Sequence, residues 1–207
     1  MRHIVFTEGR NDVHFVKSLL TSTYGTVDVD DFIVEDYVAE EGAGPTVPPE
    51  STEIRRFRAR EERGGVLVKS ENGYENLLKV FSTVLVDLCD YRLRFSLVVD
   101  CDGCGIEEVL DQLNGHVGSR YGGGVTIRQN GMTELNPDAT LVNCSVEGSS
   151  GLDDEFALVA FADSLEAAAD VVRDNDRETK EETIAEFAQE TDGFDEFAAV
   201  FEHVNDA

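Results

Sequence analysis

Residues 94–103 read RFSLVVDCDG, and this stretch decides the fold. Its first six residues are nearly continuous in apolar side chains, as expected for a strand inside a parallel sheet that is buried on both faces. Asp100 and Asp102 follow directly, and Gly103 then permits a turn. Ligands of parallel α/β sheets bind beyond the carboxyl ends of the strands. We therefore predict a central strand over 94–99 that ends at a polar site.

A second strand end near the start of the chain carries the same arrangement. Residues 2–7 read RHIVFT, a short apolar run, and Glu8 and Gly9 follow it. Apolar residues then recur at helical spacing over 13–20, and Asn11 or Asp12 can cap this helix. Carboxyl ends of parallel strands share one edge of a sheet, so both acidic clusters should lie at that edge.

The remaining pattern alternates between strands and helices. Further strands are predicted over 65–69, 125–128 and 139–146, with 32–38 as a further candidate. Helices are predicted over 72–88, 105–115, 152–163, 164–174, 179–190 and 194–203. This order predicts an α/β fold with a mainly parallel central sheet flanked by helices. Residues 1–150 would form the α/β domain, with an insertion rich in proline and arginine at about 39–63. Residues 151–207 would form a helical, acidic extension packed on it.

The charge balance is unusual for a globular chain. There are 43 acidic and 17 basic residues, which gives a net charge of −26, and only four of the basic residues are lysines. The acids are spread along the whole chain, so we interpret them as a solvated surface suited to high salt, where screening weakens self-repulsion. This composition resembles that of proteins from extreme halophiles. A specific cationic partner is the alternative. Under the high-salt interpretation, the charge of −26 does not exclude a nucleic-acid substrate.

Membrane and export signals are not expected. No run of 18 apolar residues occurs, and the N-terminal residues lack the pattern of a signal peptide. We therefore expect a soluble, cytoplasmic protein without a membrane partner.

Four cysteines include one C-x-x-C pair, Cys101 and Cys104. A zinc site would need two further ligands, and the chain has no second C-x-x-C and no H-x₃-H. A redox pair is the other possibility, but the neighbouring Asp100 and Asp102 should raise a thiol pKa rather than lower it. Free cytosolic thiols are the interpretation that we favour.

The two aspartates of residues 100–102 have a spacing suited to metal binding. In an extended D-x-D segment, both carboxylates point the same way and can face one ion. Such oxygen ligands suit Mg²⁺, which keeps some of its waters for a substrate phosphate. A D-x-D alone is weak evidence in so acidic a chain. The combination with Glu8 is stronger, because the two clusters follow separate apolar strands and each precedes a helix.

Two stretches resemble the motifs of the Toprim family. Residues 4–12, IVFTEGRND, are similar to its opening motif, and residues 96–103, SLVVDCDG, are similar to its D-x-D motif. The family includes primases, topoisomerases, OLD-type nucleases and ribonuclease M5-like maturases. The resemblance covers about residues 2–150, and the small stand-alone modules near the OLD-type and M5-like enzymes are the most similar. Residues 151–155, GLDDE, more weakly resemble an acidic element of such modules.

The resemblance implies a role for each matching residue. Glu8 would act as general acid/base or as a metal ligand, and Asp100 and Asp102 would bind Mg²⁺ or Mn²⁺. Gly9 and Gly103 would permit turns, and Asp12 would have a structural role as a helix cap. Asp153 and Asp154, expected at a helix N-terminus, are candidates for a second metal.

The chain also departs from larger members of the family. It has no ATPase P-loop, no zinc-ribbon domain of the primase kind, and no tyrosine in a recognisable DNA-gate domain. These departures argue against an autonomous topoisomerase.

Positive charge is concentrated in one short segment. Residues 53–63 carry five arginines, Arg55, Arg56, Arg58, Arg60 and Arg63. They could contact a phosphate backbone, or they could lie on an amphipathic helix that pairs them with its own glutamates. Lys69 follows a strand and could face the same site as Asp100, or it could be an ordinary surface lysine.

The function that the sequence favours is Mg²⁺-dependent phosphodiester chemistry, most simply nuclease action on DNA or RNA by Glu8, Asp100 and Asp102. One alternative is a non-catalytic Toprim-like module that binds a nucleotide or a protein partner. Another is a subunit that needs a partner chain for topoisomerase or ATPase activity. The sequence leaves the oligomeric state open.

Overall fold

The computed structural model describes residues 2–25, 27–34, 36, 52–60, 65–91, 93–149 and 151–205. Most of the predicted insertion, 39–51, and Arg63 lie outside the described residues.

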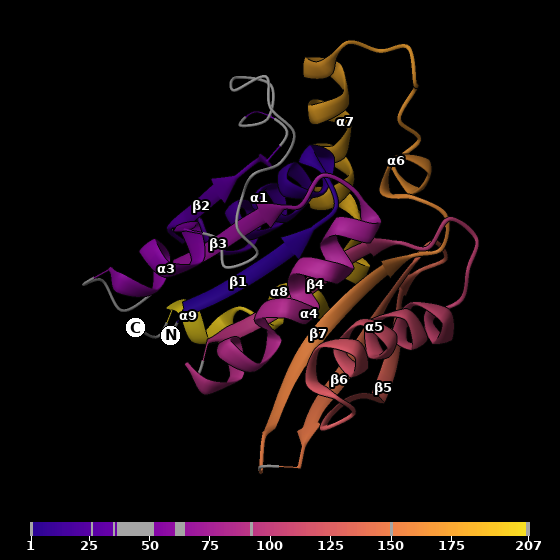
Figure 1. Cartoon of the computed structure of the whole chain (residues 1–207). Helices are drawn as coiled ribbons and strands as arrows, with labels where there is room; N and C mark the ends of the chain where they lie inside the picture. Colours follow the sequence, from indigo (N-terminus) through magenta and orange to yellow (C-terminus); the bar gives the residue numbers. More distant parts are fainter. Residues whose placement is uncertain are drawn as a thin grey trace.

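The strands of the described chain form one seven-stranded sheet in the order β2-β3-β1-β4-β7-β6-β5 (Figure 1). The strands are β1 (Arg2–Thr7), β2 (Val29–Phe32), β3 (Gly65–Ser70), β4 (Arg94–Asp100), β5 (Val125–Asn136), β6 (Ala139–Gly148) and β7 (Asp153–Phe161). The first five in spatial order are parallel, whereas β6 and β5 add an antiparallel hairpin at one edge. The predicted α/β fold with a mainly parallel sheet is confirmed, and the arrangement is consistent with a Toprim-like fold.

Helices cover both faces of this sheet, and its central strands are therefore buried on both sides. On one face, α4 (Tyr74–Asp90), α5 (Ile106–Tyr121) and α3 (Thr52–Ala59) pack with Ile4, Phe6 and Leu97. On the other face, α1 (Arg10–Tyr24) and α7 (Arg177–Glu190) pack with Val5 and Val98. Successive residues of β1 and β4 therefore enter opposite cores, as their continuous apolar runs predict.

The predicted helix over 152–163 is wrong, because this segment forms β7. The strand lies inside the sheet between β4 and β6, and its residues from Phe156 to Phe161 are buried. A short apolar run behind an acidic start fits either a helix or a buried strand, and only the pairing with β4 resolves that ambiguity. The sheet thus continues beyond residue 150.

The helices after β7 are shorter than predicted, but they do pack on the sheet. The segment predicted as a helix over 164–174 contains only α6 (Leu165–Ala168), whereas α7 matches the predicted 179–190. The predicted 194–203 helix is divided among a 3-10 turn (Asp192–Phe194), α8 (Asp195–Ala199) and α9 (Glu202–Asn205). Phe194, Phe197 and Phe201 from this region are fully buried against the sheet.

Two strand boundaries also differ from the prediction. Of the candidate strand over 32–38, Phe32 ends β2, which begins earlier at Val29, and residues 35, 37 and 38 lie outside the described residues. Acidic residues on this edge strand obscure its apolar signal. The strand predicted over 125–128 extends to Asn136, because pairing with β6 continues through two register irregularities.

Among the described helices, none is both long enough and apolar enough to cross a membrane.

Candidate functional site

The carboxyl end of the sheet brings Glu8 and Asp100 together, as the sequence predicts. Strands β1 and β4 are parallel neighbours, so the residues that follow them meet at one edge. The backbone N–H of Asp100 donates a hydrogen bond to Glu8 Oε1 at 2.7 Å. The Glu8 side chain is thereby fixed across the gap between the two strand ends.

The turn at Gly9 places Asp12 in the same cluster. The Gly9 N–H donates to Asp12 Oδ2 at 2.8 Å, which is the helix-capping contact expected of Asp12. The Asp12 side chain is buried, however, and its Oδ1 atom has no hydrogen-bond partner among the described residues. A buried carboxylate oxygen without a partner is costly, so it points to a group that is bound at this position.

The segment after β7 completes the site, and sequence reasoning missed it. Asp100 Oδ1 accepts a hydrogen bond from the Leu165 N–H at 2.9 Å. The next residue, Glu166, accepts one from Asn11 Nδ2 at 2.6 Å. Had 153–161 been recognised as a strand, the rule that ligands bind at strand ends would have pointed to Glu166.

These side chains surround an open cavity of about 300 Å³. Its wall comes from the turn after β1, the beginning of α1, the end of β4 and α6, and the residues that define it include Glu8, Asn11, Asp12, Asp100 and Glu166. Arg10 also lines this cavity and forms an ion pair with Asp36. Four carboxylates, those of Glu8, Asp12, Asp100 and Glu166, therefore line one cavity.

Burial and mutual repulsion raise the pKa values of these acids. Burial, together with the charges of Asp102 and Glu166, raises the pKa of Glu8 to about 7, although the Asp100 N–H lowers it. Burial and the charge of Glu8 raise the pKa of Asp100 to about 7. The pKa of Asp12 is also raised by burial and by Asp100. A cation in the cavity would relieve this repulsion.

Asp102 does not extend the strand as the D-x-D argument assumed. Its backbone has a φ of 47°, and the Cys104 N–H donates to the Cys101 carbonyl at 2.8 Å, so residues 101–104 form a tight turn. The Asp102 side chain is exposed and does not line the cavity. It is still close enough for its charge to raise the pKa of Glu8.

The donor set suits a hard divalent cation such as Mg²⁺ or Mn²⁺. Glu8, Asp12 and Asp100 supply oxygens, and each uses one oxygen for a backbone N–H and retains another. Within the described part of the chain, no three His, Cys, Asp or Glu side chains already stand in a metal-binding arrangement.

Lys69 is placed differently from the predicted phosphate contact. It lies on β3 with 1% of its surface exposed, forms an ion pair with Glu71, and has its Nζ 5.5 Å from the centre of the Phe32 ring. Strand alternation turns the side chain into the protein, and Lys69 does not line the cavity. Its partner Glu71 is also buried.

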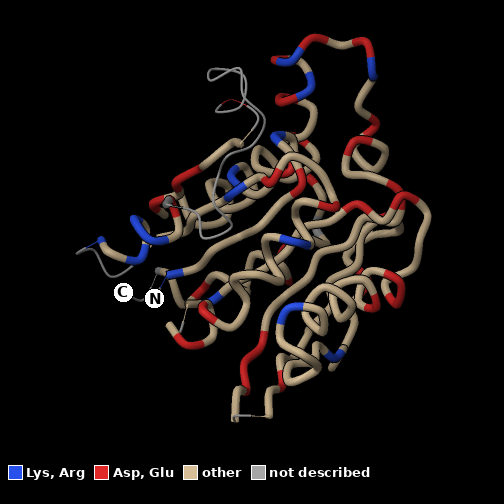
Figure 2. The backbone as a smooth tube through the Cα atoms, in the orientation of Figure 1, with Lys and Arg blue, Asp and Glu red and all other residues tan. Residues whose placement is uncertain are grey.

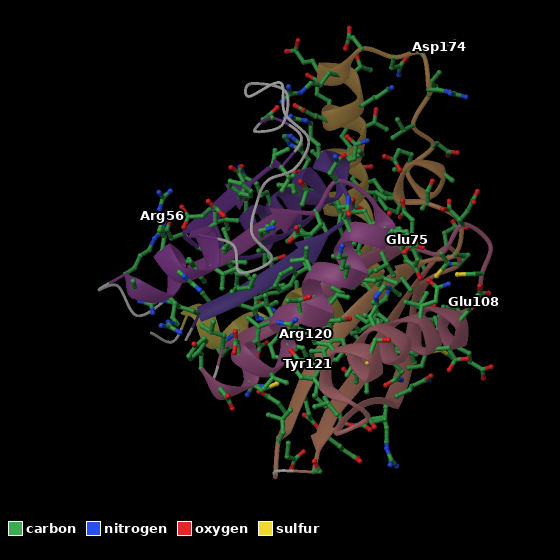
Figure 3. All side chains as sticks on the ribbon, in the orientation of Figure 1. Arg56, Glu75, Glu108, Arg120, Tyr121 and Asp174 are labelled. Atoms are coloured by element: carbon green, nitrogen blue, oxygen red, sulfur yellow. The ribbon has the colours of Figure 1, made fainter. Side chains whose placement is uncertain are left out.

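The arginine segment lies at the opposite end of the sheet. Arg2, at the start of β1, donates hydrogen bonds to the carbonyls of Arg58 and Arg60, which fixes the end of α3 there. Figure 2 shows the basic positions of α3 beside the N-terminus, and Figure 3 shows Arg56 pointing away from the body of the protein. Arg55, Arg56, Arg58 and Arg60 therefore do not lie beside the carboxylates.

The predicted second-metal residues are also remote from the site. Asp153 and Asp154 begin β7, whereas the last residue of that strand, Phe161, pairs with Asp100. At roughly 3.3 Å per residue, the length of β7 places these aspartates about 25 Å away. Their predicted role at a helix N-terminus is wrong because the segment is a strand.

The C-x-x-C pair lies in the turn after β4. Cys101 is buried and Cys104 is partly exposed. Burial and the neighbouring Cys104, with a smaller contribution from Asp100, raise the pKa of Cys101 to about 12. The expected direction of the thiol pKa is confirmed, and burial is its largest cause.

Comparison of the chain with protein-family models, curated proteins and solved structures finds no match. The resemblance to the Toprim family therefore rests on the two motifs alone and remains a prediction.

Proposed function

We propose that the carboxylate cavity carries out divalent-metal-dependent cleavage of phosphodiester bonds in nucleic acid. The observation that carries this proposal is the buried Asp12 Oδ1, which has no partner among the described residues and lies in a cavity shared with Glu8 and Asp100. The three acids come from separate elements, and each accepts a hydrogen bond from a backbone N–H. A bound cation would stabilise this arrangement, because it would offset the repulsion among the three acids.

Each residue has a part in the proposed chemistry. Glu8, Asp12 and Asp100 would hold the ion, with Asp102 and Glu166 adding negative charge around it. A divalent cation bound there supplies polarisation of a phosphoryl oxygen and a lowered pKa of bound water. Glu8 is also the group placed to accept a proton, since its carboxylate lies at the same cavity as those of Asp12 and Asp100.

The test is a cleavage assay on plasmid DNA, single-stranded DNA and structured RNA, with Mg²⁺, Mn²⁺ or EDTA, at low and molar KCl. We expect metal-dependent cleavage that falls at least about a hundredfold in Glu8→Gln and Asp100→Asn. Asp153→Asn is the matched control, since it removes one exposed carboxylate at the far end of the sheet and should leave cleavage unchanged.

Cleavage that is indifferent to both Glu8→Gln and Asp100→Asn would show that the chemistry lies elsewhere. The exposed position of Asp102 favours one alternative, a non-catalytic binding module. That alternative predicts no cleavage of any substrate, with Mg²⁺ bound by the wild type and not by Asp100→Asn.

A further inference from the structure

A second cavity, of about 460 Å³, lies between α3 and the last turns of α4. Ile54 from α3 and Val84 and Leu88 from α4 give it an apolar wall. Helix α4 begins beside the carboxylates, where the Gly73 N–H donates to the Glu8 carbonyl, and it then runs 17 residues away from them. At 1.5 Å per residue, this places the second cavity about 20–25 Å from the first.

The rim of the second cavity stacks an arginine on an aromatic ring. The guanidinium carbon of Arg58 lies 3.7 Å from the centre of the Tyr91 ring. Tyr91 is 48% exposed, which makes it one of the few large hydrophobic side chains exposed on the described surface. Arginine planes and aromatic rings are the surfaces on which unpaired nucleic-acid bases stack.

The charge of this cavity is opposite to that of the whole protein. Among the described residues that line it, Arg55 and Arg58 stand against one acid, Asp87, although the chain carries a net charge of −26. The acidic surface of the chain repels anions. A cavity with a local excess of arginine is therefore where an anionic ligand would bind. Guanidinium groups also match the geometry of phosphate oxygens.

We propose that this cavity binds one nucleotide unit of single-stranded nucleic acid. The base would stack on Tyr91 beside Arg58, the apolar wall would cover the base and sugar, and Arg55 and Arg58 would meet the phosphate. The volume falls within the usual range of small-molecule sites. This inference goes beyond the proposed function, because binding here needs neither the metal nor the carboxylates. A strand held here would reach the carboxylate cavity only several nucleotides away.

The experiment measures binding of a fluorescein-labelled 15-nucleotide oligothymidylate by anisotropy in EDTA. Tyr91→Ala should raise the Kd about tenfold, the effect of losing one base stack, whereas Tyr91→Phe should stay within about twofold because the ring is kept. Arg58→Ala should weaken binding by a similar factor. The matched control is Arg56→Ala, which removes the same charge from the same helix but from outside the cavity, and it should change the Kd less than about twofold.

Salt dependence and a catalytic-site variant complete the test. Neutralisation of one phosphate on a single strand gives a slope of log K against log salt of about −0.7. Asp100→Asn should bind the oligonucleotide like the wild type even if cleavage is lost, so failure of one proposal can be told from failure of the other. The melting temperature of each variant checks that it is folded.

Three results would overturn the inference. The first is an absence of oligonucleotide binding by the folded wild type. The second is equal loss in Arg56→Ala and Arg58→Ala, which would indicate a diffuse basic surface. The third is tighter binding of duplex than of single-stranded DNA, because paired bases cannot stack on Tyr91.

Discussion

The two ends of the central sheet hold their charged groups in opposite ways. At the carboxyl end, Glu8, Asp12 and Asp100 are at least half-buried, and each is tied to a backbone N–H. At the amino end, the arginines of α3 and residue 60 are exposed, and Arg60 pairs with Asp28 and Asp30 at the surface. Burial makes electrostatic interactions strong, and exposure to solvent makes them weak and sensitive to salt. The acids of the carboxyl end are therefore held in a fixed geometry, whereas the interactions of the arginines at the amino end change readily with salt.

The largest expected effect concerns the buried ion pair of Lys69 and Glu71 beside the carboxyl end. Lys69→Met leaves Glu71 buried without this partner, so the free energy of unfolding should fall by about 3–5 kcal/mol. Lys69→Met/Glu71→Leu removes both charges and should recover most of this loss. Urea unfolding of the three proteins measures it. Equal destabilisation in the single and double variants would show that the unpaired charge of Glu71 does not cause the loss of unfolding free energy.

An intermediate effect is expected from pH, because Glu8 and Asp100 have folded-state pKa values of about 7 and ordinary values near 4. As pH rises, the two carboxyl groups lose their protons in the unfolded chain before they lose them in the folded chain. The contribution of the protonated Glu8 and Asp100 to stability is therefore fully present below about pH 4. It is lost as pH rises through about 7. In EDTA, the wild type should lose about 1–3 kcal/mol relative to Asp100→Asn between pH 5 and 8.

Thermal unfolding across this pH range, with Asp153→Asn as control, measures that difference. Mg²⁺ should raise the melting temperature of the wild type more at pH 8 than at pH 5, because binding needs ionised carboxylates. Parallel stability profiles for the wild type and Asp100→Asn would contradict the raised pKa values.

The smallest effect is expected at the amino end. Asp30→Asn removes one acidic partner of Arg60 and leaves Asp28, and we expect a change in unfolding free energy below about 1 kcal/mol that disappears in molar KCl. Urea unfolding at low and high salt measures it. A loss as large as that of Lys69→Met would mean that the two ends do not differ in the way that their burial indicates.

Local sequence determined the strands that carry the site. The side chains of the apolar runs at 2–7 and 94–99 leave water only if both faces of each strand are covered, so these runs predict central strands. The acids that follow the two runs predict one site at the carboxyl edge of the sheet. The helical spacing of apolar residues likewise predicts α1 and α4, because one face of each must meet the core.

Tertiary structure decided what local patterns leave ambiguous. The run at 156–161 fits a helix or a strand, and pairing with β4 made it β7, which carried Glu166 into the site and moved Asp153 and Asp154 away from it. The direction of Lys69 depended on the register of β3 against β1, which turned it toward Glu71 in the interior. The pairings of β7 with β4 and of β3 with β1 join residues far apart in the chain, and their free energy is absent from any local stretch of sequence.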